Sequence, residues 1–300
     1  MVVRARWALA GAAACVVLLM LTWFAAFHIG AVRSADRAIF SGFYELSGHG
    51  WIDRLAYHLA SLCDPTPYVY FVPIPIIIAL ARGRPRVAVA VAVILLGANV
   101  TTHVLKPLLQ EPREASFFGW MAPIYGASWP SGHATAAMSL ALSTVIAVPP
   151  RIRPAVAALG ALFAVAVSYS FLTLGWHFPS DVFGGFLVAG AWTLVVVAGL
   201  LAIEGRNPYA QRKIDPVSFA RTLGPVGAAL AAGTFLATIA LVTRPHAVVA
   251  YADAHKTFVV GALAIAALGF AISTVLVLTL TPSDTGPAPT AAHRRRWRPG

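Results

Sequence analysis

The chain of 300 residues has a formal net charge of +11, yet only 11% of its residues are charged and 59% are hydrophobic. Soluble domains contain about a quarter charged residues, so this composition excludes a large soluble domain and indicates an integral membrane protein. The basic residues lie in loops and do not alternate with aromatic residues, so we expect no nucleic-acid partner.

Apolar runs long enough to cross about 30 Å of hydrocarbon recur along the chain. They predict an all-α fold, a polytopic transmembrane helical bundle with about eight spans. The first run is too long for a signal peptide and is expected to remain as a helix. Pro73 and Pro75 are expected to kink the second. The expected spans cover residues 7–29, 66–81, 87–106, 133–149, 155–174, 181–203, 223–243 and 258–281.

The distribution of Lys and Arg predicts the orientation of this bundle. If the N-terminus is cytoplasmic, the inner segments around Arg4, Arg84, Arg153 and Arg212 and the tail hold more basic residues than the outer loops. Cytoplasmic loops collect Lys and Arg. We therefore expect both termini to be cytoplasmic, in a multi-pass protein of the cell (plasma) membrane.

The chain divides into five segments. The apolar residues around Trp51 follow helical spacing and predict an amphipathic helix on the outer membrane surface. The segments are 1–65, with the first span and this interfacial stretch; 66–204, a helical core; 205–222, a cytoplasmic loop; 223–281, two additional spans; and 282–300, a basic disordered tail.

Three outer segments carry polar residues beside helix ends, where ionisable groups of membrane proteins are functional candidates. The first runs from Lys106 to Arg113, which could also be plain interfacial anchors. In the second, Ser131 can cap the helix that follows and Gly132 allows close approach of the backbone. The N–H groups at such a helix start can bind an anion beside His133. A capped helix with an incidental histidine is the alternative.

The third segment places His177 four residues before Asp181. This spacing suits a carboxylate that orients an imidazole and leaves its other nitrogen free as a nucleophile or base. An ordinary helix cap is again the alternative. The expected topology puts all three segments on the same side, where they could converge on one anion. His103, one turn before Lys106, could face the same pocket or could simply satisfy a neighbour's hydrogen bond.

Together these segments resemble the type-2 phosphatidic acid phosphatase family of membrane lipid phosphatases. The resemblance covers about residues 85–203. The chain departs from the family pattern at Glu114, where the family has Pro, and at Phe171, where it has Arg. The matching residues are Lys106, Arg113, Pro130, Ser131, Gly132, His133, Ser170, His177 and Asp181.

The resemblance implies an enzyme that hydrolyses a lipid phosphate through a phosphohistidine. His177 would attack phosphorus, Asp181 would orient it, and His133 would protonate the departing lipid oxygen. Lys106, Arg113, Ser131 and Gly132 would bind the phosphate, and Ser170, Phe171 and His103 would belong to the substrate pocket. We expect no metal and no other cofactor. Undecaprenyl diphosphate and other isoprenyl diphosphates, phosphatidic acid and phosphatidylglycerol phosphate are the candidate substrates.

Two alternatives remain open from the sequence. A phosphotransferase would pass the phosphoryl group from the same histidine to a lipid acceptor, and no residue distinguishes it from a hydrolase. The second alternative is a non-catalytic protein that binds or transports lipid phosphates. Its best support is Phe171, which stands where the family has arginine. The membrane and the lipid phosphate are the expected partners, and the sequence predicts no oligomeric state.

Overall fold

The computed structural model describes residues 2–111, 128–205 and 245–281, with Gly227, Thr238 and Val242 in helical conformation. In this part of the chain, all regular secondary structure is helical, as predicted. The elements are α1 (Val2–His28), α2 (Gly30–Tyr44), α3 (Gly50–Ser61), α4 (Pro65–Phe71), α5 (Pro73–Ala81), α6 (Pro85–Leu108), α7 (Gly132–Ala147), the 3₁₀ turn η2 (Pro150–Ile152), α8 (Arg153–Thr173), α9 (Pro179–Gly205), α11 (Pro245–Ala254) and α12 (Lys256–Leu280).

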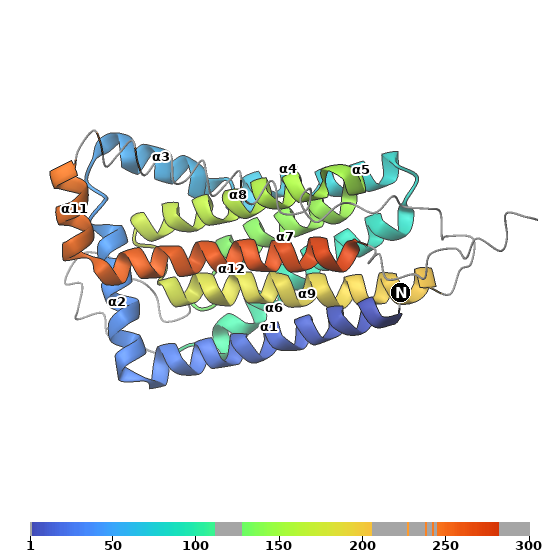
Figure 1. Ribbon diagram of the computed structural model, residues 1–300, viewed down its shortest axis with the longest axis horizontal. Helices are drawn as coiled ribbons and strands as arrows, with labels where there is room; N and C mark the ends of the chain where they lie inside the picture. Colours follow the sequence, from blue (N-terminus) through green and yellow to red (C-terminus); the bar gives the residue numbers. More distant parts are fainter. Residues whose placement is uncertain are drawn as a thin grey trace, which may run out of the picture.

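Five of the described helices, α1, α6, α8, α9 and α12, are long and apolar enough to cross a membrane. They run side by side along the long axis of the molecule (Figure 1). Helix α3 and the α4–α5 stretch pass the same test as a pair bent by 59°, which gives up to six candidate spans in the described part. The expected span over 223–243 lies outside the described residues, apart from Gly227, Thr238 and Val242. The chain is therefore a multi-pass helical membrane protein.

The expected break in the second span falls at a proline, because α4 ends at Phe71 and α5 begins at Pro73. The expected amphipathic helix near Trp51 is α3. A further amphipathic helix, α2, was not predicted, since its charged residues Arg33 and Arg37 interrupt the apolar pattern. Figure 1 shows α2 running across one end of the bundle, with α11 at the same end.

The apolar helix α7 lies at the centre of the bundle, in contact with α6, α8 and α9. Nearly all of its side chains are buried, although with 16 residues it is shorter than the spans around it. Small residues allow this close packing. A Cβ on Gly160 of α8 would lie 2.9 Å from the Cβ of Ala141 in α7. The motifs at the ends of α7 and α9 are thus set on tightly packed helices.

Candidate active site

The loops that begin α7 and α9 are joined by direct backbone contact. The Ser131 N–H donates to the carbonyl of Asp181 at 2.9 Å, and the Trp129 indole N–H donates to the carbonyl of Ser180 at 3.2 Å. A Cβ on Gly185 would lie 2.7 Å from the Ser131 carbonyl oxygen and 2.9 Å from the Thr135 nitrogen. Because those are backbone atoms that cannot move aside, only glycine allows α9 to come this close to the start of α7.

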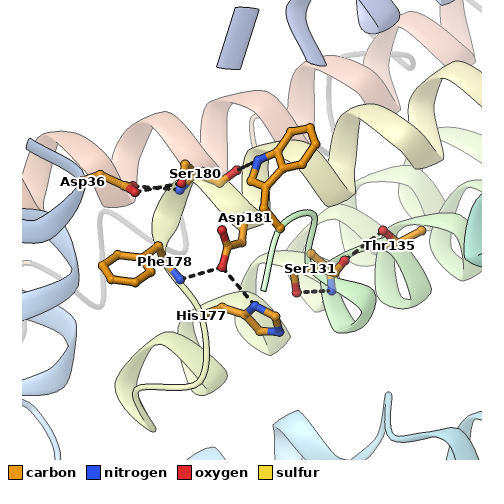
Figure 2. A network of polar contacts seen from close by, with 9 residues as sticks. Asp36, Ser131, Thr135, His177, Phe178, Ser180 and Asp181 are labelled. Atoms are coloured by element: carbon orange, nitrogen blue, oxygen red, sulfur yellow. Dashed lines mark hydrogen bonds and ion pairs between the residues drawn. The ribbon is translucent and has the colours of Figure 1, made fainter. Parts of the chain in front are cut away.

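A carboxylate from α2 holds the first turn of α9. The Ser180 N–H donates to Asp36 Oδ1 at 2.8 Å, and its hydroxyl donates to Oδ2 at 2.7 Å (Figure 2). Asp36 is buried, and the two hydrogen bonds offset the free-energy cost of burying its carboxylate. Negative charge at a helix N-terminus is also favourable. Sequence reasoning missed Asp36, because it belongs to no motif and lies 144 residues before its partner.

The expected pairing of His177 and Asp181 is present. His177 Nδ1 lies 3.1 Å from Asp181 Oδ2, and the Phe178 N–H donates to the same oxygen at 3.0 Å (Figure 2). Asp181 is wholly buried and His177 nearly so. With a carboxylate as its acceptor, Nδ1 carries the proton in the neutral ring, so Nε2 keeps a lone pair. This is the state that a nucleophilic histidine requires.

The start of α7 brings the second histidine to the same place. Ser131 caps the helix as predicted, accepting the Ala134 N–H at 3.3 Å, and the His133 and His177 rings have centroids 6.0 Å apart. Lys106 Nζ lies 3.9 Å from the position that a Cβ on Gly132 would occupy. The lysine also interacts electrostatically with His133 and with Asp181. One ammonium group, one helix N-terminus and two imidazoles are therefore gathered at one place, and together they could bind a small anion.

Phe171 occupies the position where the resemblance predicts arginine. Its ring is fully buried near the end of α8, with centroids 5.2 Å from the ring of His177 and 5.8 Å from that of His133. The side chain at position 171 therefore lies near both histidines, as expected, but it is an apolar ring and not a guanidinium. The neighbouring Ser170 hydroxyl is buried and donates to the Val167 carbonyl of its own helix at 2.7 Å.

Two of the expected site residues are not brought to this cluster by the described structure. Arg113 lies outside the described residues, as does Glu114 beside it. His103 is exposed on α6, and among the described residues no hydrogen bond or ring contact joins it to His133 or His177. The buried face of this turn carries Thr102, whose hydroxyl lies 2.9 Å from that of Thr135 in α7.

The structure adds a carboxylate that sequence reasoning did not single out. His133 Nε2 lies 2.8 Å from Asp64 Oδ1, at the junction of α3 and α4. The two residues are 69 positions apart, and Asp64 is part of none of the three motifs. Its position directly before two closely spaced prolines, Pro65 and Pro67, is the one local signal that could have drawn attention to it.

Within the described ranges, His, Cys, Asp and Glu side chains do not gather in groups of three or more that could hold a metal ion. Cys15 and Cys63 are both buried and free. Lys106 is the cationic side chain that interacts electrostatically with His133 in the described part of the chain.

Comparison with known families identifies the core that carries these residues. The model of the PAP2 superfamily matches residues 87–204, from α6 to α9. The core of this chain belongs to the PAP2 superfamily. The match confirms the resemblance predicted from the three motifs. A comparison with curated protein sequences gives no significant match.

A solved structure shares the fold. It is the first transmembrane PAP2 type phosphatidylglycerolphosphate phosphatase from Bacillus subtilis, which superposes with a TM-score of 0.53 at 20% sequence identity. The match covers 66% of this chain and 98% of that one. The PAP2 arrangement of helices is therefore common to both proteins, whereas a third of this chain lies beyond the shared part.

Proposed function

We propose that this PAP2 protein is a metal-independent phosphatase that hydrolyses a lipid phosphate or diphosphate through a phosphohistidine at the outer face of the membrane. The observation that carries the proposal is the pair of imidazoles 6.0 Å apart, one of them held through Nδ1 by a buried aspartate. A phosphoryl group between the rings would have a nucleophile on one side and a proton donor on the other.

In the first step, His177 Nε2 forms a bond to phosphorus while the bond to the lipid oxygen breaks, and that oxygen takes a proton from His133. In the second, water attacks the phosphohistidine, its proton passes to His133, and the N–P bond breaks. Lys106, Ser131 and the Gly132 backbone bind the phosphate oxygens and stabilise the charge that develops on them. Arg113 is proposed to join them, on the strength of the motif.

A membrane-embedded helical core suits a substrate whose acyl or prenyl tail stays in the bilayer. The structural neighbour acts on phosphatidylglycerolphosphate, which makes that lipid the first candidate. The test is phosphate release by the purified protein in detergent with EDTA, from phosphatidylglycerol phosphate, phosphatidic acid and undecaprenyl diphosphate. Release that EDTA leaves unchanged supports the proposal. Transfer to a lipid acceptor without release would support a phosphotransferase, and binding without turnover a non-catalytic protein.

Phe171→Arg is expected to increase hydrolysis of simple phosphomonoesters such as p-nitrophenyl phosphate, by up to about 100-fold, because it restores one charge-assisted donor to the pocket. The wild type is expected to have low activity. The guanidinium must reach the phosphate space, since Phe171 itself is fully buried. kcat/KM is measured for both proteins and for Phe171→Leu, an apolar control that should show no gain. A folded Arg variant that loses lipid turnover would place Phe171 in a pocket shaped for the lipid.

The proposed orientation predicts which cysteines react with an impermeant maleimide added to intact cells. A cysteine replacing Ala254, at the end of α11, is expected to react, and one replacing Arg86, near the start of α6, is not. Helix α11 and the junction of α5 with α6 lie at opposite ends of the bundle (Figure 1). Cys15 and Cys63 are buried and should give little background. Labelling at position 86 alone would invert the topology.

A further inference from the structure

The contact between Asp64 and His133 joins a helix junction outside the matched PAP2 region to a histidine inside it. Asp64 lies where α3 ends and α4 begins, within the pair of segments bent by 59°. Its backbone is held on both sides, because its N–H donates to the Ser61 carbonyl at 3.1 Å and its carbonyl accepts the Tyr68 N–H at 2.9 Å. These two hydrogen bonds fix the backbone from which the Asp64 side chain extends.

The local sequence leaves this carboxylate available for another partner. Asp64 is the N-cap residue of α4, where an aspartate ordinarily accepts an N–H from the second or third residue of the helix. The first and third residues here are Pro65 and Pro67, which have no N–H. Asp64 makes no side-chain capping bond, and its Oδ1 lies 2.8 Å from His133 Nε2 instead.

This contact determines which nitrogen of His133 carries a fixed proton. A carboxylate accepts and does not donate, so His133 Nε2 must be the N–H donor in the pair. Nδ1 is then the nitrogen that can exchange a proton with another molecule. If Nδ1 is to donate, both nitrogens must be protonated, and the ring carries a positive charge that the Asp64 carboxylate stabilises.

We propose that Asp64 is the positioning residue of His133, holding a proton on Nε2 so that Nδ1 serves as acid in the first step and as base in the second. The proposal rests on the function proposed above. In the first step the Nδ1 proton passes to the departing lipid oxygen, which leaves a neutral ring still bonded to Asp64. In the second, the Nδ1 lone pair takes the proton of the attacking water, and the imidazolium is restored.

The charges around His133 support this role. The groups that act on its ring are Asp64 from the α3–α4 junction, Lys106 from α6 and His177 from the loop before α9. Burial of the ring, His177 and Lys106 all oppose a positive charge on His133, so Asp64 is the one of these influences that favours it. Phe171 contributes no charge where the family pattern has arginine. When both nitrogens carry protons, the ring held by Asp64 would also supply positive charge to a pocket that lacks one cation.

The test compares Asp64→Ala and Asp64→Asn with Asp253→Asn, a control at an exposed carboxylate of α11 whose ion pair is with Lys256, at 3.6 Å. Turnover of the best lipid substrate is expected to fall by about 10-fold to 100-fold in Asp64→Ala, since general acid–base catalysis contributes about 100-fold to 10,000-fold and part of it is lost. Hydrolysis of p-nitrophenyl phosphate, whose leaving group needs little acid help, is expected to fall much less. The control should match the wild type.

A double-mutant cycle separates positioning from a structural effect. In a His133→Ala background, Asp64→Ala is expected to cause no further loss, because it acts through the missing imidazole. An equal loss in both backgrounds, or full lipid turnover in a correctly folded Asp64→Ala protein, would overturn the inference. Folding is checked by gel filtration and thermal unfolding in detergent. If Asp64→Ala does not fold, the nearly isosteric Asp64→Asn is put through the same cycle.

A measurement without turnover keeps this inference distinct from the proposed function. In protein labelled with ¹⁵N-histidine, a carboxylate-bound Nε2–H gives a strongly downfield proton signal, which His133→Ala assigns. We expect this signal in the wild type and its loss in Asp64→Ala. Its absence from the wild type would overturn the inference. Unchanged turnover in His177→Ala would instead overturn the proposed function, whatever the NMR signal shows.

Discussion

Replacing His177 with Ala is expected to lower the rate of lipid-phosphate hydrolysis by about 10,000-fold or more. Catalytic groups that act together are not additive, so removing the nucleophile alone costs about as much rate as removing the nucleophile and its partners together. His177 is the histidine whose Nδ1 is held by Asp181 and whose Nε2 keeps a lone pair. Without it no phosphohistidine forms. The variant should therefore lose both turnover and the phosphoenzyme intermediate.

The measurement combines phosphate release with rapid quenching of the protein after mixing with ³²P-labelled lipid. Phosphohistidine is stable to base and labile to acid, so the label should show that sensitivity in the wild type. His246→Ala is the matched control, because this histidine is exposed on α11. Normal lipid turnover in folded His177→Ala would exclude the proposed mechanism.

Replacing His133 with Ala is expected to lower turnover of lipid substrates by about 100-fold to 10,000-fold, the usual contribution of a general acid. A lipid alkoxide is a poor leaving group and needs a proton as its bond to phosphorus breaks. A nitrophenolate leaves without one. The loss for p-nitrophenyl phosphate should therefore be much smaller, and the ratio of the two rates is the diagnostic quantity.

The rate ratio is measured for the wild type, for His133→Ala and for His133→Asn, which retains polar groups but cannot serve as an acid. Both variants should show the same selective loss. Equal losses for lipid and aryl substrates would indicate that His133 binds phosphate or supports the fold instead of donating a proton. In that case the role proposed for Asp64 would also have to change.

Several features followed from the sequence alone because they depend on neighbours a few residues apart. Apolar runs of membrane length predicted the long helices. A spacing of four brought His177 to Asp181 at the start of α9, and a serine before an apolar run predicted the cap of α7. The motif order then identified the PAP2 core. Each of these is local chemistry or a linear pattern that a sequence displays directly.

Other features depended on how the helices pack. The contact of Gly185 with the start of α7 brings the two histidine loops together. Asp36 reaches the first turn of α9 across 144 residues, and Asp64 reaches His133 across 69. Neither aspartate belongs to a periodic pattern or a motif. Their partners are determined by which helix ends meet in space, and helix packing depends on side-chain shapes along whole interfaces, which no local spacing encodes.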